Sequence, residues 1–252
     1  MPDRVERTID AARRGFNDEL LSADYPQIHG DAVQVDRLVD FLDPRPGGCY
    51  LDLATGNGDV AFAVAGRQPA ARVLAIDIAD RAVSRNRRRA TDLERANVEF
   101  HVTDGRRIDF PDATFDGIAC RYAFHHLPDV AATLADVRRV LRPAGVFVVA
   151  DAVRHPLDDL DFINRFQALK PDGHVRMHTA EGLIELFRAH DFEAGGRFAS
   201  AITFNRDLDA DHRKLIAATP PEFLGLYDVK TIGERVVLTF DVLIVKFLVV
   251  AD

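Results

Sequence analysis

The sequence has few of the residues that mark disulfide-rich, metal-rich or membrane proteins. Its 252 residues include only two cysteines, Cys49 and Cys120, and both lie in apolar segments typical of strands. This excludes a disulfide framework and a cysteine-rich metal site. The longest apolar stretch, Val242 to Ala251, is interrupted by Lys246 and is too short to span a bilayer. We therefore expect reduced core thiols and no membrane insertion.

An excess of basic residues and an N-terminal hydrophobic targeting segment are also lacking. The net charge is −8, from 32 Lys and Arg against 40 Asp and Glu, so we expect no nucleic-acid partner. The first residues alternate charged and apolar side chains, unlike a secretory signal. With 47% hydrophobic and 29% charged residues the composition is that of a globular protein, which we expect in the cytoplasm. The sequence does not distinguish a monomer from a homodimer.

Short apolar segments alternate with amphipathic ones between residues 48 and 152. This pattern is typical of βαβ units whose parallel strands are buried on both faces. Strands are predicted at 49–53, 72–78, 98–102, 115–120, 146–151, 198–204 and 236–250. Helices are predicted at 4–21, 31–42, 130–141, 157–168 and 179–190. The last strand is unusually long, so we expect a bend or bulge near Phe240–Asp241.

We interpret the chain as a single α/β domain, because no repeat or low-complexity linker divides it. Its predicted parts are a helical N-terminal cap at 1–45, a core of strands and helices at 46–152, a segment after the fifth strand at 153–192, and C-terminal strands and a helix at 193–252.

A glycine-rich loop follows the first strand and leads into a helix. Gly56 and Gly58 allow the backbone to turn tightly and to approach a ligand closely. With Ala61 they also fit the dinucleotide fingerprint, and Asp77 lies 21 residues beyond Gly56 at the end of the second strand. The loop therefore indicates a nucleotide-type cofactor.

The charges of this loop favour one cofactor over another. Asp52 and Asp59 flank the loop, and no Lys or Arg lies between them in the sequence. Two carboxylates would repel a pyrophosphate, whereas S-adenosylmethionine (SAM) has no phosphate and carries a cationic amino group and sulfonium. Asp77 can accept hydrogen bonds from the ribose of either cofactor. SAM is therefore preferred, and a nicotinamide oxidoreductase is the less favoured alternative.

Four stretches follow one another in order: YLDLATGNGDVA, AIDI, VTDGRRIDFPDATFDGIACRYAFHHLPD and RVLRPAGVFVVAD. Together they resemble the class I SAM-dependent methyltransferases, and most of all the branch of the ubiquinone and menaquinone C-methyltransferases. The resemblance covers about residues 25–190. It implies a seven-stranded, mostly parallel Rossmann-like sheet with an antiparallel C-terminal hairpin, a SAM-binding core at 46–152, a substrate lid after the fifth strand at 153–192, and SAM as cofactor.

We expect the cofactor to contact the first strand, the glycine-rich loop and the ends of the next three strands. The residues are Asp52, Ala54, Thr55, Gly56, Gly58, Asp77, Ile78, Asp104, Gly105 and Arg121. In the family the loop lies on the methionine part, Asp77 holds the ribose and Asp104 reads the adenine. Ala54 departs from the family, which more often has glycine there, but a small residue should still fit.

The segment after the fourth strand is the candidate for catalysis, because ligands of open α/β sheets lie beyond the carboxyl ends of the strands. A histidine suits deprotonation of an acceptor near neutral pH. His126 aligns with a histidine that recurs in the family, so we expect it to be the base, with His125 as the alternate. Packing or capping of this turn is the non-catalytic alternative.

The acceptor is expected to contact the helical cap, the turn after the fourth strand and the lid. The residues are Tyr25, His29, Tyr122, His174 and Arg176. No spacing typical of a metal site is present, so no metal is expected. The predicted activity is methylation of a carbon or oxygen of a small molecule. The alternatives are a non-methylating reaction on the same fold, such as cyclisation or decarboxylation, and a binding module with a vestigial SAM site.

Overall fold

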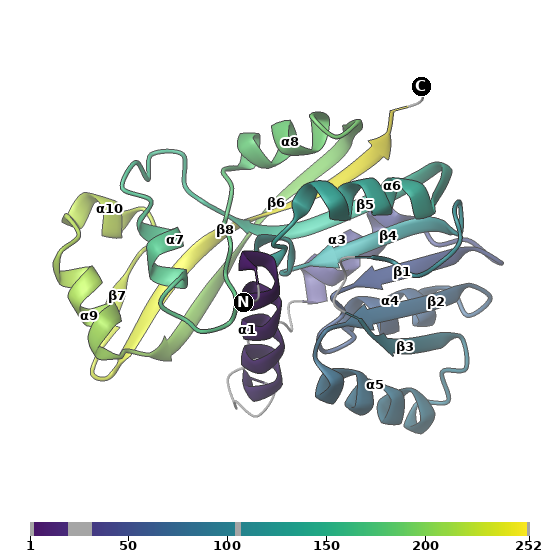
Figure 1. The fold of residues 1–252 in the computed structure, drawn as a ribbon, viewed down its shortest axis with the longest axis horizontal. Coiled ribbons are helices and arrows are strands. Elements are labelled where there is room, and N and C mark those ends of the chain that lie inside the picture. Colours follow the sequence, from purple (N-terminus) through teal and green to yellow (C-terminus); the bar gives the residue numbers. More distant parts are fainter. Residues whose placement is uncertain (1–2, 20–31, 104–106, 251–252) are drawn as a thin grey trace.

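The computed structural model describes residues 3–19, 32–103 and 107–250 (Figure 1). Its helices are α1 (Arg4–Glu19), α3 (Ala32–Leu42), α4 (Asp59–Arg67), α5 (Asp80–Asp92), the short 3₁₀ helix η1 (Phe124–His126), α6 (Val130–Val140), α7 (Phe162–Gln167), α8 (Ala180–Arg188), α9 (Ala210–Ala217) and α10 (Pro221–Gly225). Its strands are β1 (Cys49–Leu53), β2 (Arg72–Asp77), β3 (Val98–Val102), β4 (Phe115–Arg121), β5 (Leu141–Val153), β6 (Phe192–Asp207), β7 (Lys230–Ile232) and β8 (Arg235–Val249).

The strands form one sheet in the order β3-β2-β1-β4-β5-β8-β6, with the short β7 paired to β8. The pairs from β3 to β5 are parallel, whereas β8 is antiparallel to both β5 and β6. The predicted Rossmann-like sheet with an antiparallel C-terminal hairpin is confirmed. The described residues contain eight strands rather than seven because β7 adds a short edge strand.

Helices cover both faces of the sheet, as Figure 1 shows. Alternate residues of β1 supply the two cores: Tyr50 packs in the layer of α3 and α4, whereas Leu51 and Leu53 pack in the layer of α6 and α8. Polar caps fix two of these helices, because Asp129 and Thr179 accept hydrogen bonds from backbone N–H groups of α6 and α8, each at 3.0 Å. The result is a three-layer α/β/α arrangement.

The hairpin of β6 and β8 extends well beyond the parallel strands (left side of Figure 1). On its distal half, Phe162, Phe166, Tyr227 and Phe240 form a chain of ring contacts with centroids 5.7–6.2 Å apart. These rings join α7 to the hairpin and to the segment after α10. The sequence analysis does not predict α10 or β7, which are too short to show a clear period.

The irregularity expected near Phe240–Asp241 is not there. The pairing of β6 with β8 runs without a shift through those residues, and the register shift lies between Ala194 and Gly196 instead. A glycine inside a strand weakens the ladder and favours a bulge, which explains this place. The helix expected from 157 begins only at Phe162, because the carboxylate of Asp158 accepts the N–H groups that start it.

The helix α1 lies across the end of the sheet at which the parallel strands finish (Figure 1). A Cβ atom on Gly15 would lie 2.8 Å from the Cα atom of Asp172, so α1 and the segment after α7 are in close contact. Of the two helices expected to form the cap, α3 packs on the sheet face instead.

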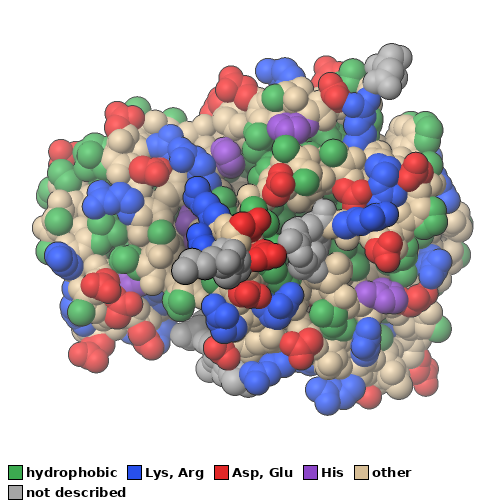
Figure 2. Space-filling view, viewed as in Figure 1, with side chains coloured by type: hydrophobic (Ala, Val, Ile, Leu, Met, Phe, Trp, Pro, Cys, Tyr) green, Lys and Arg blue, Asp and Glu red, His purple; other side chains and the backbone are tan. Residues whose placement is uncertain are grey.

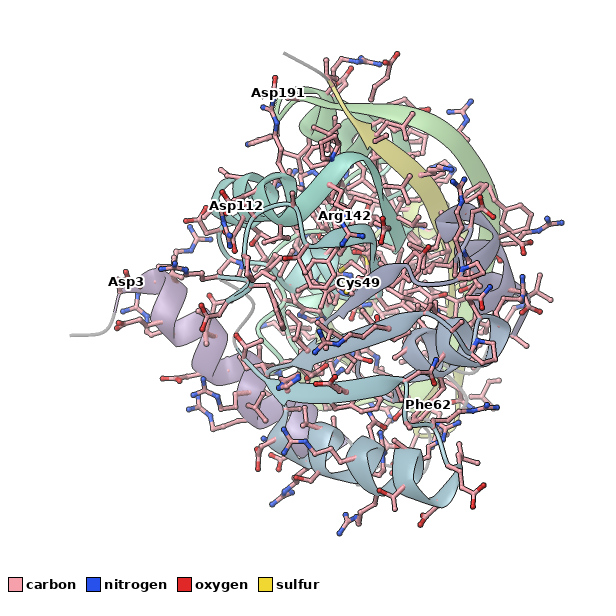
Figure 3. The ribbon with its side chains drawn as sticks, turned by 90° about the vertical axis from the view of Figure 1, so that its right-hand side faces the viewer. Asp3, Cys49, Phe62, Asp112, Arg142 and Asp191 are labelled. Atoms are coloured by element: carbon pink, nitrogen blue, oxygen red, sulfur yellow. The ribbon has the colours of Figure 1, made fainter. Side chains whose placement is uncertain are left out.

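Both cysteines are free thiols, as expected. Figure 3 shows Cys49 and Arg142 near one another at the opposite end of the sheet, where β1 and β5 begin. In the part of the chain that the structure describes, no helix is long and apolar enough to cross a bilayer.

Candidate active site

The loop between β1 and α4 turns through left-handed backbone. Ala54, Gly56 and Gly58 have φ values of 58°, 50° and 79°. Glycine adopts this region without steric cost, whereas an alanine is strained there. A Cβ atom on Gly58 would also lie 2.9 Å from the ring of Phe62. Glycine is therefore needed at 58, and Ala54 keeps the same turn at some cost.

Asp52 braces this loop from the end of β1. Its Oδ2 atom accepts a 2.6 Å hydrogen bond from the Thr55 hydroxyl and a 3.0 Å bond from the N–H of Ala61. Burial raises the pKa of Asp52 to about 7. A cation bound beside this carboxylate would favour its ionised form, which suits the cationic end of SAM.

Asp77 braces the same loop from the end of β2. It accepts hydrogen bonds from the N–H groups of Gly56 at 2.7 Å and Ala79 at 2.8 Å. Burial raises the pKa of this carboxyl, and the backbone donors oppose that rise. Asp77 therefore fixes the loop in addition to any contact with a ribose.

Arginines from α5 and β4 lie beside this loop, although the sequence of the loop itself contains no arginine. Arg85 donates to the side chain of Asn57, and Arg89 donates to its carbonyl at 3.2 Å. Arg121, at the end of β4, lies 3.7 Å from Asp59. The absence of cations from the loop sequence therefore does not make its surroundings purely acidic.

Two adjoining cavities lie between this loop, the strand ends and α1. The polar cofactor cavity is lined by Asp52, Ala54, Thr55, Gly56, Asp77 and Arg121, among others. The apolar cofactor cavity is lined by Ile9, Phe16, Ile78, Leu127 and Pro128, again with Ala54 and Asp77. A polar end beside carboxylates and an apolar end fit the methionine and adenosine parts of SAM. Asp104 and Gly105 lie outside the described residues.

His125 is held by Asp151, which lies in β5 directly after the apolar residues 146–150. The backbone N–H of His125 donates to one carboxylate oxygen at 2.9 Å, and its ring Nδ1 lies 2.6 Å from the other. Burial lowers the pKa of His125, but the charge and hydrogen bond of Asp151 outweigh burial and raise it. The pair resembles a base with its orienting carboxylate.

His126 has the opposite surroundings. Its ring packs edge-on against Phe16, with centroids 4.9 Å apart, and lies 4.2 Å from the ring of His125. Its Nδ1 atom is buried without a hydrogen-bond partner among the described residues. Burial, helped by the charge of His125, lowers the pKa of His126 to about 3. The His126 ring is therefore neutral near physiological pH.

The lid segment is tied to these histidines. Backbone N–H groups of Val175 and Arg176 both donate to the carbonyl of His125, at 2.9 and 3.1 Å. His174 lies 5.7 Å from the ring of His125 and is held by a 2.9 Å hydrogen bond to the side chain of Asn164. The side chain of Arg176 is exposed. The structure thus brings His174, but not the Arg176 side chain, to the histidine pair.

A third space also has both histidines in its lining, and we call it the acceptor cleft because an acceptor is expected beside them. It is lined by residues of α1, the turn after β4, η1, β5, α7 and the segment after it, β6 and α9, including Phe16, Tyr122, His125, His126, Lys170, Asp172, Met177, Phe204, Arg206 and His212. Tyr122 is buried and donates its hydroxyl to Gln34 of α3. Tyr25 and His29 lie outside the described residues. The sequence analysis misses Arg206 and His212, which have no motif around them.

The described residues contain no group of three or more His, Cys, Asp or Glu side chains arranged to hold a metal ion. The fold and the two cofactor cavities define a class I SAM-dependent methyltransferase domain. A family model described as a methyltransferase domain matches residues 45–200, and the chain belongs to this family.

Within the family the chain is related to quinone-pathway C-methyltransferases. It is 31% identical over 154 residues to the ubiquinone/menaquinone biosynthesis C-methyltransferase UbiE of Paracoccus denitrificans, covering 61% of this chain and 60% of that protein. It is 32% identical over 173 residues to nocamycin O-methyltransferase of Saccharothrix syringae, covering 66% and 61%. The matches thus span about 60% of the length of these curated relatives.

Solved structures with the same fold include the YcgJ protein from Bacillus subtilis, with a TM-score of 0.74 at 21% identity over 87% of this chain and 99% of that chain. The [4+2]-cyclase SpnF has a TM-score of 0.62 at 19% identity, covering 87% and 81%. These similarities show the fold alone, and one fold can support more than one type of reaction.

Proposed function

We propose that the protein transfers a methyl group from SAM to a carbon or oxygen of a small-molecule acceptor in the acceptor cleft. When bound, SAM supplies an electrophilic methyl group on its sulfonium. One observation carries the proposal: Phe16 and His126 line both the acceptor cleft and the apolar cofactor cavity. Tyr122 likewise lines the polar cofactor cavity and the cleft. Molecules in the two spaces meet at these side chains, as an in-line displacement requires.

We propose that His125, rather than His126, accepts the proton of the acceptor. The sequence alone prefers His126. However, the 2.6 Å contact with Asp151 orients the His125 ring and favours its protonated form. His126, whose pKa is lowered to about 3, is a weak base. We therefore propose that His126 positions the acceptor at the shared wall.

The acceptor is proposed to carry a ring system. Apolar side chains of Phe16, Tyr122, Met177 and Phe204 line the cleft and suit a planar apolar group. The name of one relative, which concerns ubiquinone and menaquinone biosynthesis, supports a ring-bearing acceptor for this chain as well.

Methyl-labelled SAM incubated with a panel of ring-bearing acceptors tests this function. Transfer of label together with release of S-adenosylhomocysteine (SAH) in equal amount is the expected result. A product that forms without SAH release would instead support a non-methylating reaction. We test for such a reaction because a cyclase has the same fold.

A further inference from the structure

The acceptor cleft contains a largely buried cation that forms no ion pair with any residue that the structure describes. Arg206 of β6 lines the cleft, and its Nη2 atom donates a 2.7 Å hydrogen bond to the side-chain oxygen of Gln167. Its guanidinium lies 5.0 Å from the centre of the Phe166 ring. Both contacts are with neutral groups, so they orient the guanidinium without neutralising it.

The carboxylates that line the same cleft have other side chains as partners. Asp172 lies 2.9 Å from Lys170, and Asp209 lies 2.8 Å from His212. The third, Asp207, pairs with Arg235 at 3.2 Å. No ion pair within the described part of the chain includes Arg206. Burial lowers the pKa of Arg206, and the more distant charges of Asp172 and Asp209 only oppose that shift.

An uncompensated cation in such a place is costly. Charges removed from water are usually paired, and breaking a buried pair is strongly destabilising. A planar guanidinium with its orientation fixed by Gln167 and Phe166 matches the two oxygens of a carboxylate. A ligand in the cleft can supply the missing negative charge.

We propose that the acceptor is an anion whose carboxylate, or an equivalent planar oxyanion, binds Arg206 while its ring lies along the apolar wall. This inference rests on the proposed function and names the substrate class of the same cleft. It makes Arg206 a specificity-determining residue, which recognises the acceptor and takes no part in proton transfer.

Calorimetry on the protein saturated with SAH tests this, with 2-naphthoate as the probe and 2-naphthamide as its neutral counterpart. The wild type should bind naphthoate clearly more tightly than naphthamide. Arg206→Gln should weaken naphthoate binding by roughly 10- to 100-fold, the loss expected for hydrogen bonds to a charged group. Arg197→Gln, an exposed site on the same strand, removes the same charge outside the cleft and should leave naphthoate affinity unchanged.

Two readouts separate recognition from a structural role. Without ligand, Arg206→Gln should melt at or above the wild-type temperature, since it removes an uncompensated charge. Arg206→Lys, which keeps the charge but loses the planar fork, should also weaken naphthoate binding. Equal affinity for naphthoate and naphthamide in the wild type, or unchanged naphthoate affinity in Arg206→Gln, would overturn the inference. Failure of SAH itself to bind would instead overturn the proposed function.

Discussion

At the scale of single residues, the histidine pair of η1 is the most informative feature. His125 and His126 are adjacent, yet one has a carboxylate 2.6 Å from its ring and the other has a buried nitrogen without a described partner. The pKa of the first is therefore raised, and the pKa of the second is lowered to about 3. Environments that separate the pKa values of neighbouring groups commonly assign them different roles in catalysis.

Substitution of each histidine tests this division. His125→Gln should reduce turnover with an accepted substrate by about 10²- to 10⁴-fold, the usual range for a general base, while SAH affinity stays nearly constant. His126→Gln removes an identical ring one position away and should chiefly raise KM. Steady-state kinetics of both variants, with SAH titrations as the control, measure this. A large loss of turnover in His126→Gln alone would return the base role to His126.

The low pKa of His126 also predicts a dependence of stability on pH. In the unfolded chain the pKa of His126 is about 6.5, whereas burial lowers it to about 3 in the folded protein. The neutral form of this ring therefore favours the folded state. This stability is complete above pH 6.5 and is lost as pH falls, by about 1.4 kcal/mol per pH unit. Between pH 7 and pH 5, the wild type should therefore lose about 2 kcal/mol more than His126→Gln in urea unfolding. Equal losses in both proteins would show that folding does not lower the pKa of His126.

At the scale of secondary-structure elements, α1 links the cofactor cavities to the acceptor cleft. Phe16 of this helix lines all three spaces. The close packing of this helix depends on Gly15, where a Cβ atom would lie 2.8–2.9 Å from backbone atoms of Pro171 and Asp172. Because backbone atoms cannot rotate away, the position tolerates only glycine while α1 stays in place.

Gly15→Ala should therefore displace α1 although alanine favours helix formation. We expect a lower melting temperature and weaker SAH binding. Gly225→Ala in α10, where a Cβ atom has no neighbour within 4 Å, is the matched control and should change neither property adversely. Thermal unfolding with and without SAH measures both effects. If Gly15→Ala matches the control, α1 is not seated as described.

The elements of the parallel core could be predicted from the sequence, because each rests on a local signal. The strand at 146–151 begins with five consecutive apolar residues, and the strand at 98–102 alternates apolar and polar residues. Asp129 and Thr179 mark helix starts that the structure confirms. The distal part of the hairpin could not be predicted in this way. Its short elements depend on long-range contacts, such as that of the Tyr227 hydroxyl with Asp158 at 2.8 Å.

At the scale of the whole molecule, the acceptor cleft is assembled from segments far apart in the chain, from Phe16 of α1 to His212 of α9. The glycine-rich loop is contiguous, so the binding of a nucleotide-type cofactor could be inferred from a short stretch of sequence with Asp77. The contact of His125 with Asp151, and the place of Arg206, depend on tertiary packing and leave no pattern in the sequence. Acidic and basic side chains are interspersed over the face that carries α1 (Figure 2).

The glycine-rich loop, with Asp52 and Asp77, is expected to bind SAM and not a dinucleotide. Calorimetric titration of the wild-type protein with SAH, and separately with NAD, tests it most directly. We expect saturable binding of one SAH per chain, a rise in melting temperature with SAH, and neither effect with NAD. Saturable binding of NAD by a protein that ignores SAH would contradict it.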